Sequence, residues 1–153
     1  MPNTKPVGVA YSDPDLSGAT VDNTPIGAVT PSTVVGTTVY ATSEIGYSAA
    51  AQGTVTQATS KSTAVTLNNS AGQITMNGAA LAGNTAVSFT LTNSTLSAKD
   101  VIIPCIAGGA TAAAYTTYVS SMAAGSAVIT LRNLTAGSLS EAVVLNFAII
   151  HCT

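Results

Sequence analysis

Apolar and polar residues alternate with a period of two, in run after run, from about residue 53 to the end of this 153-residue chain. In TAVSFTLT, for example, Val87, Phe89 and Leu91 fall on one side of an extended strand and the residues between them on the other. One apolar face and one mostly polar face are typical of antiparallel strands that cover a core. Eight runs fit, the first most weakly: TVTQ (54–57), AVTL (64–67), GQITM (72–76), TAVSFTLT (85–92), VIIPCI (101–106), AYTTYVS (114–120), SAVITLRN (126–133) and VVLNFAII (143–150).

Short connections rich in Gly and Asn separate these runs, for example NNSAG after Leu67 and MAAGS after Ser121. Gly and Asn supply the positive φ that tight turns need. Short strands at this spacing predict an all-β fold, an antiparallel β-sandwich or jelly roll of about eight strands over residues 51–153. The run VIIPCI is apolar on both faces, and its Pro104 places that strand at a sheet edge or a bulge.

Residues 1–50 have a different character. They hold five of the six prolines, and their apolar residues occur singly. Such a segment cannot by itself bury enough surface to offset the entropy of ordering it. We therefore expect an extended N-terminal arm that is held by a partner. Its expected anchors are the isolated apolar residues Val7, Val9, Tyr11, Leu16, Ile26 and Val29.

The chain carries very little charge: 7% of its residues, with a net charge of −2, against roughly 25% in ordinary soluble proteins. Because a free monomer usually keeps charge for solubility, this composition favours a chain that works inside an assembly. Four scattered cations cannot form the basic patch of a nucleic-acid-binding protein. No run approaches the roughly 18 apolar residues of a membrane span. The first residues, MPNTKPVGVAYSDPD, do not have the pattern of a signal peptide.

The run from TVTQATSKSTAVTLN through GQITM to ITLRNLTAGSLSEAVVLNFAII, about two thirds of the chain, resembles a small β domain of tailed-bacteriophage virion proteins. The arm's TPIGAVTPSTVVGTTVYAT is similar to the Thr-Pro-Ile-Gly repeat that precedes β domains in phage fibre and head-decoration proteins. The resemblance implies a structural virion protein, and it implies a homotrimer. Fibre proteins place such domains at the end of long chains, whereas this chain is short and has no long shaft. This difference favours a head decoration, cement or head-fibre protein over a tail fibre.

Two functions of different classes follow. In the first, the chain is assembled in the host cytoplasm, decorates the outer capsid surface, and binds the major capsid protein through its arm. In the second, it is a tail-fibre or host-adhesion tip whose loops after Met76, Thr92 and Ile106 contact a cell-surface ligand. An enzyme is not expected and ranks third behind these two, because few titratable groups are present. No cofactor and no metal are expected.

Four patterns resemble functional sites. Asp13, Asp15, Ser17 and Gly18 open like a calcium loop, but Thr24 stands where a bidentate Glu is needed. His151, the single histidine, could centre a metal site or a Ser-His-Asp arrangement, but no G-x-S-x-G turn is present; a strand-end residue or a subunit contact is favoured. Asp100 and Glu141, the acids of the β domain, could be the paired carboxylates of sugar hydrolysis, but each lies beside a turn. Of Tyr115 and Tyr118, one is expected in the core and the other at the surface.

Two smaller features complete the sequence. Cys105 and Cys152 lie in apolar runs, and we expect two buried free thiols, with a disulfide as the alternative. The triplets Asn68-Asn69-Ser70, Asn93-Ser94-Thr95 and Asn133-Leu134-Thr135 match the glycosylation pattern. In a chain rich in Asn, Ser and Thr such matches are expected by chance.

Overall fold

The computed structural model describes residues 35–152, and by its internal contacts the chain divides between Thr42 and Ser43. The fold set out below belongs to the second unit. Residues 35–48 contain no helix or strand and are exposed, and a single 3-10 turn, η1 (Ala49–Ala51), precedes the first strand. The six expected anchors of the arm and the calcium-like loop at Asp13 lie outside the described residues.

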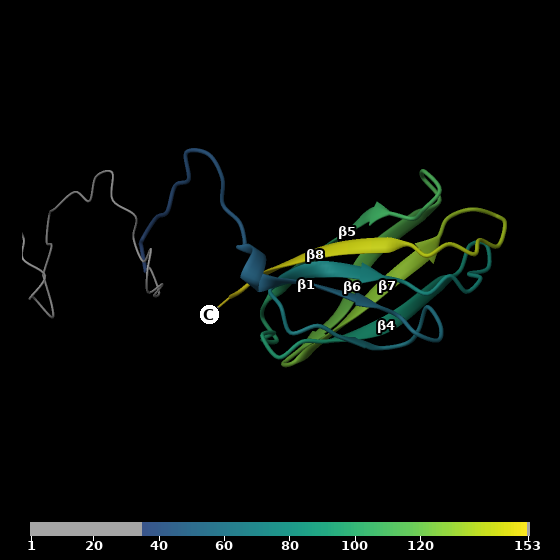
Figure 1. Cartoon of the computed structure of the whole chain (residues 1–153), viewed down its shortest axis with the longest axis horizontal. Coiled ribbons are helices and arrows are strands. Elements are labelled where there is room, and N and C mark those ends of the chain that lie inside the picture. The colour runs from purple at the N-terminus through teal and green to yellow at the C-terminus, as the bar shows by residue number, and fades with distance from the viewer. Residues whose placement is uncertain (1–34, 153) are drawn as a thin grey trace, which may run out of the picture. The chain divides into compact units, whose positions relative to one another are not determined.

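The second unit is a β-sandwich of two four-stranded sheets, as the alternation predicts (Figure 1). Sheet A has the strand order β1-β3-β8-β5, and sheet B has the order β2-β4-β7-β6. The strands are β1 (Gln52–Thr56), β2 (Val65–Thr66), β3 (Ala71–Thr75), β4 (Ala86–Thr92), β5 (Val101–Gly108), β6 (Tyr115–Ala123), β7 (Ser126–Asn133) and β8 (Val144–Ile150). All eight expected runs therefore form strands.

Four of the six strand pairings are antiparallel, and the two at one side of the sandwich are parallel. In sheet A, β8 pairs antiparallel with β3 and β5, and in sheet B, β7 pairs antiparallel with β4 and β6. The pairs β1–β3 and β2–β4 are parallel. Local alternation cannot distinguish these cases, since a strand with one buried face reads the same in either direction.

The core lies between the sheets and is made by the apolar members of the alternating runs. On β7, Ala127, Ile129 and Leu131 are 0–2% exposed, and the alternating residues Leu145, Phe147 and Ile149 of β8 are buried as well. Tyr115 is buried and Tyr118 is 46% exposed, as expected for two residues three apart on one strand. The Tyr115 hydroxyl is a buried group without a hydrogen-bond partner in the described part of the chain.

The strand that contains Pro104 lies at a sheet edge, as predicted. Strand β5 is the last strand of sheet A, and its pairing with β8 is irregular between Ile106 and Gly108. Just beyond it, Gly109 adopts φ +64°, and a Cβ there would lie 2.2 Å from the Ala142 carbonyl oxygen. Only glycine combines that φ with so close an approach.

Two of the three glycosylation-like triplets lie at strand ends. Asn93 directly follows β4, Asn133 is the last residue of β7, and both side chains are fully buried. Each Oδ1 accepts two hydrogen bonds from the threonine two residues on, Thr95 or Thr135, through its backbone N–H and its hydroxyl. These asparagines therefore make Asx turns, the local structure that this residue type favours after a strand.

Across residues 35–152 we find no helix with the length and apolar character needed to cross a bilayer.

Candidate interaction surface

The outer face of sheet A carries no charged side chain, because none of its four strands contains Asp, Glu, Lys or Arg. Its outward residues form cross-strand rows. Val101 pairs with Ile150, and Ile103 pairs with Ala148, which in turn pairs with Ala71. The next row, Cys105–Asn146–Gln73–Thr54, is more polar. The face is thus apolar toward the start of β5 and polar toward β1.

The apolar part, here called the β5–β8 patch, consists of Val101, Ile103, Ala148 and Ile150 together with Ile45 and Tyr47, which border the end of β8. Val101 is 48% exposed, and Ile103 and Ile150 are each 54% exposed. Ile45 is 86% exposed. Single exposed apolar residues are ordinary, but a contiguous set of a few hundred Å² marks a place where something binds.

Residues 45–47 border a groove of about 500 Å³ against the last residues of β8. The Tyr47 hydroxyl donates a hydrogen bond to the Ile149 carbonyl oxygen, and Gln52 donates through Nε2 to the Tyr47 carbonyl oxygen. These contacts hold the segment that precedes β1 next to the C-terminal end of β8. Figure 1 shows η1 close to the C-terminus of the chain. Ala148, Ile150 and His151 also line this groove.

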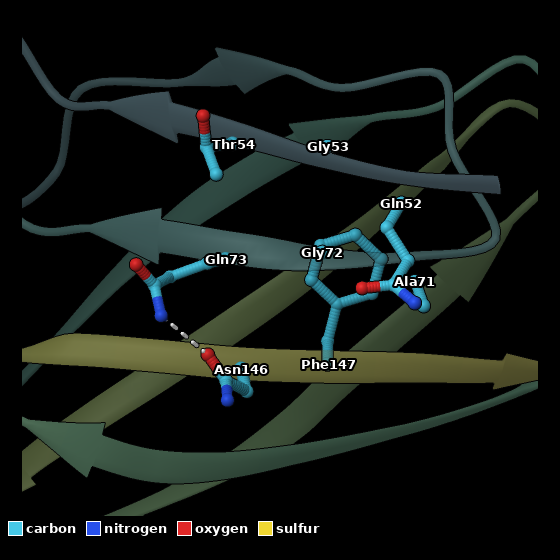
Figure 2. Close-up of a pocket in the computed structure, with 8 residues that line it drawn as sticks. All are labelled: Gln52, Gly53, Thr54, Ala71, Gly72, Gln73, Asn146 and Phe147. Atoms are coloured by element: carbon cyan, nitrogen blue, oxygen red, sulfur yellow. Dashed lines mark hydrogen bonds between the residues drawn. The ribbon is translucent and has the colours of Figure 1, made fainter. Parts of the chain in front are cut away.

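A second, polar groove of about 390 Å³ lies over β1, β3 and β8. Figure 2 shows Gln73 and Asn146 side by side on its floor, joined by a 2.9 Å hydrogen bond from Gln73 Nε2 to Asn146 Oδ1. Gly53 and Gly72 lie beneath it, where a Cβ would come within 2.7 Å of the Leu67 side chain. The glycines therefore allow β1 and β3 to approach the core closely. The side chains of Gln73, Asn146 and Thr54 line the groove.

At the C-terminal end of sheet A, His151 lies between Ser70 and Asp100. Its Nδ1 is 2.9 Å from Asp100 Oδ2, and its Nε2 is 3.2 Å from Ser70 Oγ. The strand order explains this meeting. Because β8 lies between β3 and β5 and runs antiparallel to both, the residue after β8 comes next to the residues just before β3 and β5.

Asp100 is the anchor of this cluster. Its side chain is 2% exposed, and its carboxylate accepts hydrogen bonds from the backbone N–H of Ser97 and of Cys152 and from the Ser97 hydroxyl. These donors, Ser97 N–H first, hold the pKa of Asp100 well below its usual range. The carboxylate is an acceptor only, so His151 Nδ1 is the donor in that bond, and in the neutral tautomer with its proton on Nδ1, Nε2 can accept from Ser70.

The opposite end of the sandwich holds Lys61 and Glu141. Lys61 is 3% exposed, and its ammonium donates to the carbonyl oxygens of Asn77 (2.6 Å) and Glu141. Burial lowers the pKa of Lys61, and the Glu141 charge partly offsets that effect. The Glu141 carboxylate accepts from the Thr111 hydroxyl and backbone N–H, which lowers its pKa. Burial, reinforced by Glu141, raises the pKa of Tyr115 to about 12.

This geometry excludes paired-carboxylate chemistry for Asp100 and Glu141. Asp100 immediately precedes β5, whereas Glu141 binds Thr111 beyond the other end of that eight-residue strand. The strand separates them by about 25 Å, and glycoside hydrolysis needs carboxyl groups within roughly 10 Å of each other. Within residues 35–152 no three His, Cys, Asp or Glu side chains gather in a way that could hold a metal ion.

Two expectations need correction. Cys105 and Cys152 are free thiols, but both are exposed rather than buried: Cys105 falls on the outer face of β5, and Cys152 follows the end of β8. The three loops expected to form one ligand-reading surface do not lie together. Strand β4 runs back toward the end from which β5 starts, so the loop after Thr92 lies opposite the loops after Met76 and Ile106.

No family model, curated protein or solved structure matches this chain.

Proposed function

We propose that this chain is a structural component of a phage virion, a decoration, cement or head-fibre protein on the outer capsid surface. The sequence resemblance supports the assignment to virion structural proteins. One structural observation, the uncharged outer face of sheet A with its β5–β8 patch, supports a role within a larger assembly. The arm, through Val7, Val9, Tyr11, Leu16, Ile26 and Val29, binds the major capsid protein. Binding the assembled shell and not its free subunits stabilises the shell by mass action.

The β5–β8 patch is suited to contact with further copies of the same chain. Around a three-fold axis the same residues of each copy lie close together, so a charged face turned toward that axis would bring like charges together. This face has no charge to repel its copy, and its centre is apolar while its margin carries the amides Gln73 and Asn146. A homotrimer formed in this way joins three arms, so that modest affinity of each arm becomes slow dissociation of the whole.

Replacing Ile103 by aspartate is expected to abolish self-association. The substitution puts one carboxylate per copy at the centre of the β5–β8 patch, where desolvation and like-charge repulsion together oppose assembly. Sedimentation velocity should show wild-type oligomers and Ile103→Asp monomers at the same concentration. Thr116→Asp, at an exposed position on β6 of sheet B, is the control and should leave the oligomer intact. An Ile103→Asp protein with the wild-type mass in solution would remove the patch from the proposal.

Deleting residues 1–30 is expected to leave a folded β-sandwich that no longer decorates capsids. All eight strands lie within residues 52–150, so the circular dichroism spectrum and thermal transition of the sandwich should persist. Occupancy on purified capsids that lack this protein is measured by quantitative gel analysis, and a fall of at least tenfold is expected because the arm supplies the capsid contact. Full occupancy by the truncated protein would contradict that role of the arm.

The alternative, a tail-fibre or host-adhesion tip, differs in copy number. A decoration protein is present in hundreds of copies in each particle, whereas a fibre part is present in a few trimers. Counting this chain per virion by quantitative mass spectrometry distinguishes the two, and a handful of copies would favour the adhesion tip.

A further inference from the structure

Ser70, His151 and Asp100 have the connectivity of an activated nucleophile. In such a site a base hydrogen-bonds the nucleophile, and a third group orients the base. Here His151 Nε2 lies 3.2 Å from Ser70 Oγ, and His151 Nδ1 lies 2.9 Å from Asp100 Oδ2. Recognition of such a set depends on geometry and roles, not on sequence order or a particular turn.

Ser70 and Asp100 are each held in place by contacts outside the cluster. The Ser70 carbonyl oxygen accepts the Ile149 backbone N–H at 2.8 Å, which ties the serine to β8. Asp100 is held by Ser97 and by the backbone of Cys152, so its carboxylate cannot turn away from the imidazole. His151 is the accessible member, with 36% of its side chain exposed. The arrangement is therefore rigid behind the histidine and open in front of it.

An apolar groove adjoins the same histidine. His151 is one of the residues that line the groove of about 500 Å³, together with Ile45, Tyr47, Ala148 and Ile150. A small apolar group that enters this groove comes to rest beside the imidazole, and this selects the chemical class of the substrate. A charged group gains nothing there, because the walls offer no counter-ion.

We propose that Ser70 is a catalytic nucleophile that His151 activates, and that the site hydrolyses esters of small apolar acyl groups. Ser70 Oγ forms a bond to the ester carbonyl carbon while its proton passes to His151 Nε2. The tetrahedral adduct then breaks its bond to the alkoxide, which takes that proton and leaves as the alcohol. Water attacks the acyl-serine with His151 as base, and the proton returns to Ser70 Oγ as the carboxylic acid departs.

The test uses the purified full-length chain, p-nitrophenyl butyrate as substrate and a fluorophosphonate as covalent label. Because p-nitrophenolate leaves without a proton, turnover depends mainly on the Ser70–His151 step. We expect slow hydrolysis, labelling that peptide mass spectrometry maps to Ser70, and loss of both in Ser70→Ala. His151→Asn should slow labelling by about 100-fold, the lower range of a general base. Ser94→Ala, another exposed serine, should behave as wild type.

A purely structural cluster gives the opposite results. If Ser70, His151 and Asp100 only fasten the end of β8, labelling at Ser70 will be no faster than at Ser94 and will not change in His151→Asn. Either finding would overturn the proposal. Both substituted side chains lie at the end of the sandwich and outside its core, and equal thermal transitions of the variants check that folding is preserved. The groove shares Ile45, Tyr47, Ala148 and Ile150 with the β5–β8 patch, so self-association through that patch would cover it. The assay is therefore run in the Ile103→Asp background, which is expected to be monomeric. It contains no capsid, so its outcome is separate from that of the virion proposal.

Discussion

Replacing Asn133 by alanine is expected to lower the free energy of unfolding by about 3–4 kcal/mol. The side chain is fully buried and makes four hydrogen bonds: Nδ2 donates to the carbonyl oxygens of Leu81 (3.0 Å) and Gly137 (2.9 Å), and Oδ1 accepts twice from Thr135. Alanine removes all four bonds and leaves a small cavity, at roughly 1 kcal/mol for each lost bond. Urea denaturation at a fixed protein concentration measures the difference.

Asn133→Asp should be worse than alanine above about pH 4. The carboxylate would face the Leu81 and Gly137 carbonyl oxygens, which accept and cannot donate, so the folded state raises its pKa above the unfolded value. The unfolded state then holds fewer protons than the folded state as pH rises, and stability falls with pH. Asn146→Ala is the control, since that exposed amide makes one side-chain bond, to Gln73, and should cost less than 1 kcal/mol. An Asn133→Ala protein as stable as Asn146→Ala would contradict this account.

The strands were predictable because their signal is local. A period of two is written into each run, and burial of one face is enough to select a strand, so all eight runs and the edge position of Pro104 follow from nearby residues. The β5–β8 patch also has a local signal in the sequence. VIIPCI is apolar on both faces, and Ala148 and Ile150 are apolar residues on the outward side of β8. Apolar residues on the solvent side of a strand are the mark of a covered surface.

Other features depend on strand order, which no local pattern contains. Ser70, Asp100 and His151 are separated by at least 30 residues, and they meet only because β8 lies between β3 and β5. The parallel pairing of β1 with β3 is equally invisible, since alternation has no direction. The burial of Lys61 was missed for a related reason: a lysine in a polar turn normally lies in solvent, and the two carbonyl oxygens that hold it come from distant segments.

Replacing Lys61 by methionine is expected to lower the free energy of unfolding by about 2–3 kcal/mol. Methionine keeps a flexible apolar stem of similar length, so the change isolates the ammonium group. That group donates to the Asn77 and Glu141 carbonyl oxygens and joins the turn at 58–63 to two distant segments. Without it both oxygens lose a charged donor, although removal of a buried charge returns part of the desolvation cost. Lys99→Met, at an exposed lysine, should change stability by less than about 0.5 kcal/mol.

The pH dependence of the Lys61→Met difference tests the cause. Burial lowers the pKa of Lys61 in the folded state, so between that value and the unfolded pKa of about 10.4 the unfolded chain binds more protons. Wild-type stability therefore rises with pH in this window relative to Lys61→Met, which has no proton to release. The difference in stability between the two proteins should widen as pH increases toward 10. A gap that narrows with pH would mean that Glu141 and the two carbonyl oxygens together favour the charged ammonium in the folded state more than burial disfavours it.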